Sequence, residues 1–196
     1  MLAATVSAIG PPLFGSPSIL PIQAFDPSMV TEASPAVRAA ASFLLTILFG
    51  GAVIYRGGGR LDGAVEASSE RPLAAVVYGL MAFGIVTFFV VYAFSQLANL
   101  GIGTTVLTAL GAVVFAVAFL SLGGLGFAVV GVWVTESFGG RDPWAGLVGV
   151  GAVSAVAWLV LPAVVSVAVW LAIAAIGLGG PARRWVHGSG PPADPA

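Results

Sequence analysis

Residues 72–135 contain no charged side chain, and no other feature of the sequence constrains the fold as strongly. Since about 20 apolar residues span the hydrocarbon core of a bilayer, this segment is long enough to cross it twice. A second uncharged segment covers residues 143–182, and a shorter apolar one covers residues 39–55. These segments predict a polytopic membrane protein.

The composition leads to the same class. Apolar residues make up 59% of the chain and charged residues 8%, whereas an ordinary globular domain is about 45–50% apolar and about 25% charged. The net charge of −1 argues against nucleic acid as a partner, because the chain has no basic stripe to neutralise phosphates. All seven basic residues are arginine, a usage typical of a GC-rich genome.

The chain carries few residues that could perform catalysis. It has no cysteine and a single histidine, His187, so it lacks thiolates and has few ligands for a transition metal. The carboxylates lie in the polar segments between the apolar ones, and no Ser/His/Asp or paired-carboxylate arrangement is available. We therefore expect a protein that is not an enzyme and that has no catalytic, cofactor-binding or metal site.

Residues 1–35 are predicted to form a Pro-rich arm outside the cytoplasm. The prolines at positions 11, 12, 17, 21, 27 and 35 prevent a long helix, because each removes a backbone donor and clashes with the preceding turn. No basic residue precedes the first apolar run, so the segment does not resemble a signal peptide. A partly ordered arm and plain disorder both fit its composition.

Residues 36–186 are predicted to form an all-α, transmembrane helical bundle of about five spans, followed by a disordered tail over residues 187–196. Pro162 divides the last apolar block, so we expect the last two spans to form a Pro-centred hairpin, with one kinked helix as the alternative. Gly179, Gly180 and Pro181 are expected to end the last span. The expected spans are residues 39–55, 73–97, 111–134, 144–161 and 163–178.

The third apolar run is longer than the hydrocarbon core, which is about 30 Å thick. Its helix must therefore tilt, or break near Gly111 or at Gly123-Gly124. We expect a break at Gly111, with a short outer piece before it and a full span after it.

Residues 60–70 lie between the first two spans. Leu61 and Val65 share one face of a helix there, and Asp62, Glu66 and Glu70 lie on another. The pattern fits a short amphipathic helix at the membrane surface, and it fits a solvated charged loop equally well.

The arginines predict the orientation of the bundle in the cell membrane. With five spans, one side carries six of them, and the other side carries only Arg38. Because basic loops stay in the cytoplasm, we expect the N-terminus outside and the C-terminus inside. A single final span would weaken this asymmetry, so the charges favour five spans. The six arginines of the inner side are Arg56, Arg60, Arg71, Arg141, Arg183 and Arg184.

Six polar residues are expected at the outer ends of the second and third spans. They are Ser95, Gln96, Asn99, Thr104, Thr105 and Thr108. They could line a shallow mouth for a small neutral solute, or they could satisfy the unpaired backbone groups of the helix ends, which is the interpretation we favour. Intramembrane ionisable residues usually mark transport. None lies in residues 72–135 or 143–182, which argues against a charge-coupled pump.

Small residues recur about one helical turn apart in the spans. Examples are Gly146, Gly149, Gly151 and Ala155, and Ala112 with Ala116. Such residues let helices approach closely in lipid, where packing rather than hydrophobicity drives association. The pattern predicts a tightly packed bundle or a homo-oligomer.

The part of the chain from Gly50 to Trp185 resembles the multi-span membrane region at the C-terminus of some archaeal and bacterial bactofilin-like (polymer-forming) proteins. The β-repeat part that would polymerise is missing here, so the resemblance implies a shared membrane module of unknown role and no functional residue. The matching strings are Glu70-Arg71-Pro72-Leu73, Gly79-Leu80, Gly101-Ile102-Gly103 and Asp142-Pro143-Trp144.

Together these observations predict a membrane anchor or interaction module. Its expected partners are the lipid bilayer and either a second copy of the chain or another membrane protein. The alternative function is a passive channel or carrier for a small neutral solute.

Overall fold

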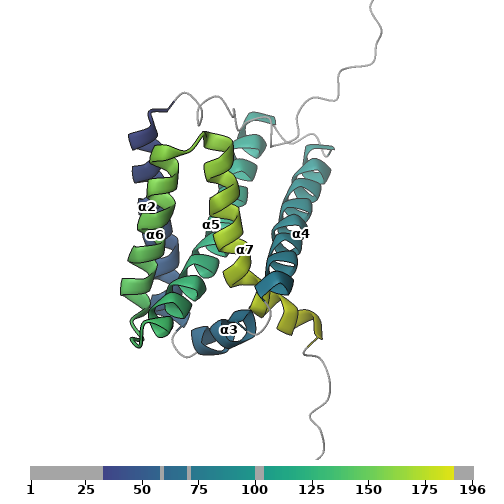
Figure 1. Ribbon diagram of the computed structural model, residues 1–196. Helices are drawn as coiled ribbons and strands as arrows, with labels where there is room; N and C mark the ends of the chain where they lie inside the picture. The colour runs from purple at the N-terminus through teal and green to yellow at the C-terminus, as the bar shows by residue number, and fades with distance from the viewer. Residues whose placement is uncertain (1–32, 58–59, 70–71, 100–103, 188–196) are drawn as a thin grey trace, which may run out of the picture.

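The computed structural model describes residues 33–57, 60–69, 72–99 and 104–187. Within these residues the chain forms only α-helices, and five of them are long and apolar enough to cross a membrane. The predicted all-α bundle of five spans is confirmed (Figure 1). Most of the predicted arm and tail lies outside the described residues. The helices are α2 (Pro35–Gly57), α3 (Arg60–Ser69), α4 (Pro72–Asn99), α5 (Thr104–Ser137), α6 (Pro143–Val160) and α7 (Ala163–His187).

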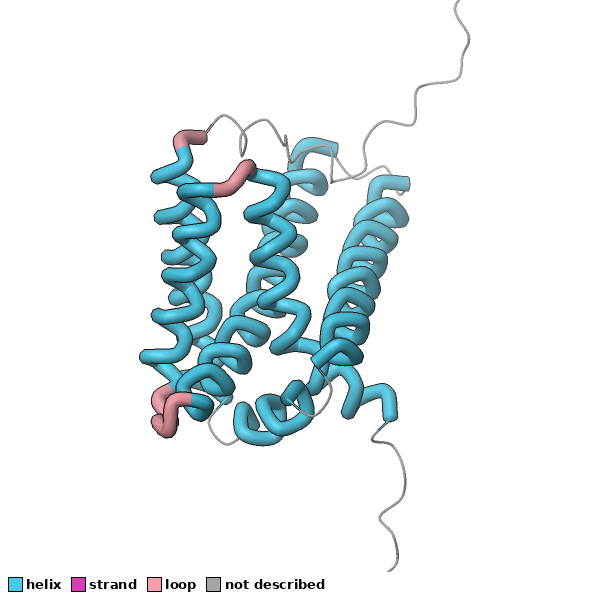
Figure 2. The backbone as a smooth tube through the Cα atoms, viewed as in Figure 1, coloured by secondary structure: helices cyan, strands magenta, loops and turns pink. Residues whose placement is uncertain are grey.

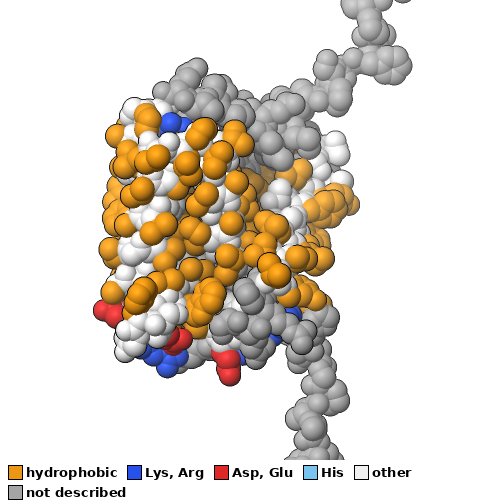
Figure 3. Space-filling model, viewed as in Figure 1, with side chains coloured by type: hydrophobic (Ala, Val, Ile, Leu, Met, Phe, Trp, Pro, Cys, Tyr) orange, Lys and Arg blue, Asp and Glu red, His pale blue; other side chains and the backbone are white. Residues whose placement is uncertain are grey.

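The face of the bundle seen in Figure 3 is mainly apolar between its two ends. Large side chains such as Leu44, Phe88 and Val153 are more than 60% exposed, whereas small ones such as Ala174 and Ala175 are fully buried. Such a surface suits hydrocarbon, where large side chains face lipid and small ones let helices approach. In water it would be an aggregation liability.

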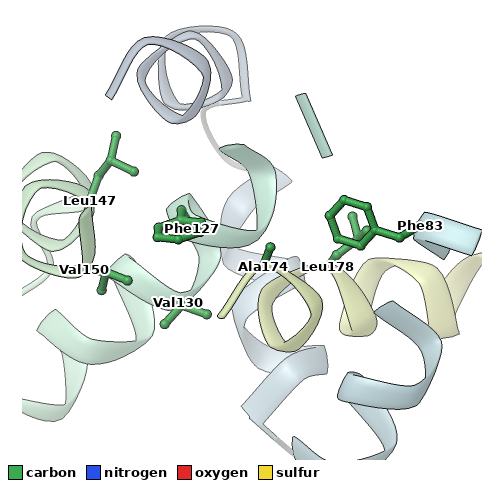
Figure 4. Packing of buried hydrophobic residues seen from close by; sticks show 7 residues of the cluster. All are labelled: Phe83, Phe127, Val130, Leu147, Val150, Ala174 and Leu178. Atoms are coloured by element: carbon green, nitrogen blue, oxygen red, sulfur yellow. The ribbon is translucent and has the colours of Figure 1, made fainter. Parts of the chain in front are cut away.

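The centre of the bundle lies around α5 and α7. α5 crosses it obliquely, beginning near α4 and ending near α6 (Figure 2). One buried apolar cluster joins the four helices α4, α5, α6 and α7 (Figure 4). Its members are Phe83, Phe127, Val130, Leu147, Val150, Ala174 and Leu178.

Glycines bring the backbones of the central helices into contact. A Cβ on Gly177 of α7 would lie 2.6 Å from the carbonyl carbon of Gly126 in α5, and one on Gly131 of α5 would lie 2.7 Å from that of Gly146 in α6. These separations are shorter than any that a real Cβ tolerates, so only glycine fits there. Of the small residues noted in the sequence, Gly146 lies at such a crossing, whereas Gly149 faces open space.

The predicted break at Gly111 is wrong, because α5 is continuous from Thr104 to Ser137. A glycine inside a helix costs only about 1 kcal/mol, and no proline interrupts this run. Gly111 also packs against the ring of Phe94 in α4, since a Cβ added at Gly111 would lie 3.0 Å from Phe94 Cδ1. α5 accommodates its extra length by crossing the bundle obliquely (Figure 2).

The last two spans form the predicted Pro-centred hairpin. α6 ends at Val160 and α7 begins at Ala163, with Pro162 between them. The turn has no polar residue of its own, but the buried Ser166 hydroxyl lies 3.1 Å from the carbonyl of Ala157 and 3.2 Å from that of Pro162. Because Ala157 O already accepts from the N–H of Leu161 and Pro162 O from the N–H of Ser166, this hydroxyl, which donates to one carbonyl at a time, adds a second contact across the turn.

The expected end of the last span at Gly179-Gly180-Pro181 is wrong as well, since α7 continues through Pro181 to His187. Proline has no N–H group, so Pro181 leaves the carbonyl of Gly177, four residues earlier, without its helical partner. Ser68 of α3 supplies a replacement: its hydroxyl donates to Gly177 O (3.3 Å) and accepts from the N–H of Gly180 (3.2 Å). A contact from another helix thus stabilises the continuation of α7.

Of the two alternatives for residues 60–69, a helix and a loop, the structure has the helix. This helix, α3, lies across one end of the bundle (Figure 1). Leu61, Val65 and Ser68 are buried against α5 and α7, while Glu66 is exposed. Arg184 of α7 lies 3.5 Å from Glu66. Arg56, at the end of α2 just before α3, therefore lies at the same end of the bundle as Arg184.

Candidate functional site

The six polar residues expected at the outer ends lie where the sequence places them in the helices. Ser95, Gln96 and Asn99 belong to the last turns of α4, and the three threonines belong to the first turns of α5. Ser95 donates its hydroxyl proton to the carbonyl of Tyr92 at 2.7 Å. Tyr92 lies seven residues before the end of α4 at Asn99, so its carbonyl belongs to the interior of the helix, and this bond favours neither the solute mouth nor the capping of helix ends.

A pocket lies elsewhere in the bundle, between α2, α5, α6 and α7, and none of these six residues lines it. Its volume is about 360 Å³. We call it the lateral pocket, because the exposed side chains of Val37 and Val167 lie on its rim. Its lining consists of Ala33, Val37, Arg38, Ala41, Ser42, Leu45 and Thr46 from the α2 side, Phe119, Leu120 and Gly124 from α5, Trp158 from α6, and Val167 and Trp170 from α7.

The lateral pocket follows from the shape of the hairpin. α6 and α7 diverge from the turn at Pro162 and contact each other little below it (Figure 1). Trp170 forms one wall and is held by stacking on Phe119, with 5.6 Å between ring centroids. Gly123 leaves room for this indole, since a Cβ there would lie 2.5 Å from Trp170 Cζ2.

Three residues that line the lateral pocket each carry a buried polar side-chain atom without a hydrogen-bond partner in the described part of the chain. The atoms are Arg38 Nε, Thr46 Oγ1 and Trp158 Nε1. Thr46 is only 4% exposed, and Trp158 is only 9% exposed. A buried donor without an acceptor costs about 1–3 kcal/mol. The two N–H groups, of Arg38 and Trp158, therefore indicate a missing acceptor, whereas the Thr46 hydroxyl lies about two turns deeper along α2.

Two of these residues also touch each other. The guanidinium carbon of Arg38 lies 5.9 Å from the ring centroid of Trp158, a cation–π distance. Beside them, Ser42 of α2 and the buried Ser154 of α6 share a hydrogen bond of 3.3 Å. α2 and α6 are thereby held together along one wall of the pocket, so the two N–H groups have a defined position.

Sequence reasoning missed this pocket. Arg38 entered only as the single arginine on the outer side, and Trp158 and Thr46 entered only as parts of spans. The usable signal was the placement of one arginine in the first turn of a span whose lipid-facing neighbours are all apolar. That Trp158 meets Arg38 across 120 residues of chain is decided by the packing of α6 on α2.

The fold and the surface define the class: the chain is a multi-pass integral membrane protein with five candidate spans. No protein-family model, no curated protein and no solved structure matches it. In the described ranges there is no group of three or more His, Cys, Asp or Glu side chains that could hold a metal ion. The features that bear on its role are the packing of its helices and the lateral pocket.

Proposed function

We propose that the protein is a non-enzymatic membrane anchor or interaction module, set in the cell membrane with its N-terminus outside and its C-terminus in the cytoplasm. The observation that carries this proposal is the filled centre of the bundle. α5 is in backbone contact with α7 at Gly126 and with α6 at Gly131. It also contacts α2, since a Cβ on Gly124 would lie 2.7 Å from the nitrogen of Gly50.

The alternative function, a passive channel or carrier, needs a polar path through the bundle. The residues at the centre are instead apolar and closely packed, among them Phe127, Leu147 and Ala174 with no exposed surface. Support for the alternative comes only from the polar outer ends of α4 and α5. It is therefore the weaker of the two proposals.

We expect purified protein in liposomes to give no flux of a small neutral solute such as glycerol above that of empty liposomes. Swelling of the liposomes in a stopped-flow light-scattering experiment measures this flux. A known glycerol facilitator, reconstituted at the same protein-to-lipid ratio, is the positive control. Flux well above the empty liposomes, from protein that elutes as a bare monomer, would overturn the anchor proposal in favour of the channel.

α4 is the helix that we propose to face a protein partner, either a second copy or another membrane protein. Only 17% of its most apolar 18-residue stretch is buried inside the bundle, the smallest share among the five spans. Phe88, Phe89 and Tyr92 form an exposed aromatic row on it, with Phe88 and Tyr92 stacked at 5.9 Å. Large side chains also face lipid elsewhere on the bundle, so the small buried share of α4 is what supports this choice of helix. The resemblance to the membrane region of bactofilin-like proteins is compatible with such a module.

The orientation is testable by cysteine labelling, because the natural chain has no cysteine. Ser137 at the end of α5 and Ser34 before α2 are both exposed and lie at opposite ends of the bundle. In intact cells we expect a membrane-impermeant maleimide to label Ser34→Cys and to spare Ser137→Cys, which should react only after lysis. The reverse pattern would show that the bundle has the opposite orientation.

A further inference from the structure

We propose that the lateral pocket binds one anionic phospholipid of the outer leaflet, with the phosphate at Arg38 and Trp158 and an acyl chain along the apolar walls. This inference goes beyond the anchor function, because it assigns a ligand and a site. It follows from three observations: the unpartnered donors, the single positive charge, and the length and polarity of the pocket.

The donors specify the chemistry of the headgroup. The Nε–H of Arg38 and the Nε1–H of Trp158 can only donate hydrogen bonds, so their missing partner is an acceptor. Arg38 is the only arginine at this end of the spans, and a guanidinium recognises phosphate oxygens through charge-assisted hydrogen bonds. An anionic phosphate group beside Arg38 would neutralise this charge, and small rotations of the Arg38 and Trp158 side chains would bring their buried N–H groups within reach of its oxygens.

The remaining lining specifies an acyl chain. Apart from Ser42 and Thr46, the walls below Arg38 are apolar. From Val37 to Thr46, α2 rises about 14 Å, or nearly half of the hydrocarbon core of about 30 Å. The pocket therefore extends through about one leaflet, and a free phosphate ion would leave it mostly empty. Thr46 lies two turns below Arg38, too deep to contact the same headgroup.

The pocket opens where a lipid can reach it. Val37 is 59% exposed and Val167 40% exposed at its rim. Both lie on faces of α2 and α7 that no other described helix covers. A lipid can therefore enter sideways from the bilayer, whereas a water-soluble ligand would have to cross apolar surface.

The test is native mass spectrometry of the full chain in a mild detergent. Phosphatidylglycerol and phosphatidylcholine with the same acyl chains are titrated separately, and the first bound lipid is quantified. We expect wild type to bind phosphatidylglycerol roughly tenfold more tightly than phosphatidylcholine, because both lipids carry the phosphate but the choline ammonium of phosphatidylcholine cancels its net charge and is repelled by Arg38. A wild-type protein without this preference, as expected if a second copy already fills the pocket, would overturn the proposal.

Three variants locate the site. Arg38→Gln should remove the preference, and Trp158→Phe, which keeps an aromatic ring but lacks the N–H, should reduce it roughly threefold. Arg56→Gln, an exposed arginine at the other end of α2, is the matched control and should keep the preference. Circular dichroism and elution volume check that each variant folds. An equal loss in Arg56→Gln, or no loss in both Arg38→Gln and Trp158→Phe, would contradict a site in the lateral pocket.

Discussion

Gly79→Ala should lower the free energy of unfolding by about 1–3 kcal/mol, the usual cost of overpacking a well-packed core. Gly79 lies on α4 against the backbone of α7, where a Cβ would come within 2.6 Å of the carbonyl carbon and the Cα of Ala175. Backbone atoms cannot rotate away as a flexible side chain can. The two helices would have to separate, and α7 is also held by Gly126 of α5 on its other side.

The same helix offers a matched control. Gly84 of α4 is exposed, and a Cβ there would meet nothing within 4 Å. Since alanine is a better helix former than glycine by about 1 kcal/mol, Gly84→Ala should be neutral or slightly stabilising. Unfolding midpoints of both variants in the same mild detergent, followed by circular dichroism, give the comparison. Equal destabilisation by the two variants would show that the α4–α7 crossing is looser than described.

Ser68→Ala is expected to destabilise the protein by about 1–3 kcal/mol, although it removes only one oxygen atom. Ser68 is 2% exposed and bonds to two backbone groups of α7, the carbonyl of Gly177 and the N–H of Gly180. Without the hydroxyl, the Gly177 carbonyl loses the partner that replaces the N–H missing at Pro181. We expect the last turns of α7 and the neighbouring α3 to lose order together, as measured by hydrogen exchange.

A double-mutant cycle tests the reason for this effect. Pro181→Ala restores an N–H group that can bond to the Gly177 carbonyl within α7, so Ser68→Ala should cost less in that background. A coupling energy above about 0.5 kcal/mol between the two substitutions is expected. Strictly additive effects would indicate that Ser68 contributes only by packing between α3 and α7.

The ion pair beside Ser68 contributes little by comparison. Arg184 and Glu66 are 3.5 Å apart, and their side chains are 48% and 74% exposed. Exposed pairs of this kind are worth about 0–1 kcal/mol. α3 is therefore held to the end of the bundle mainly by its buried face, including Leu61 and Val65, and by the Ser68 hydroxyl.

The helix boundaries show where local sequence rules apply and where they fail. Pro162 follows the end of α6, and a turn there was one of the two forms that the sequence predicted, because proline removes a backbone donor. Pro181 does not end α7, because Ser68 from α3 pairs with the carbonyl that it leaves free. Both prolines remove a backbone donor, and the contact of α3 at Pro181 comes from a distant part of the sequence, so it could not be predicted from the residues around that proline.

The lateral pocket shows the same limit for the site. The polar residues at the ends of α4 and α5 are visible as a cluster in the sequence, yet none of them lines it. Arg38 and Trp158 come from α2 and α6, far apart in the chain, and they meet only because Ser42, Ser154 and the close packing of these helices bring them together. The sequence contained the residues and no sign of their proximity.

The sequence by itself determined the class of protein, because apolar length acts in any packing arrangement, and it favoured five spans and a hairpin at Pro162 over one kinked helix. Only the tertiary structure decided which glycines lie at helix crossings, why α5 and α7 continue past Gly111 and Pro181, and where a pocket with unpartnered donors forms. The physical reason is that every span is apolar, so hydropathy does not tell one neighbour from another. Which faces meet is then decided by close packing and by single hydrogen bonds between distant residues.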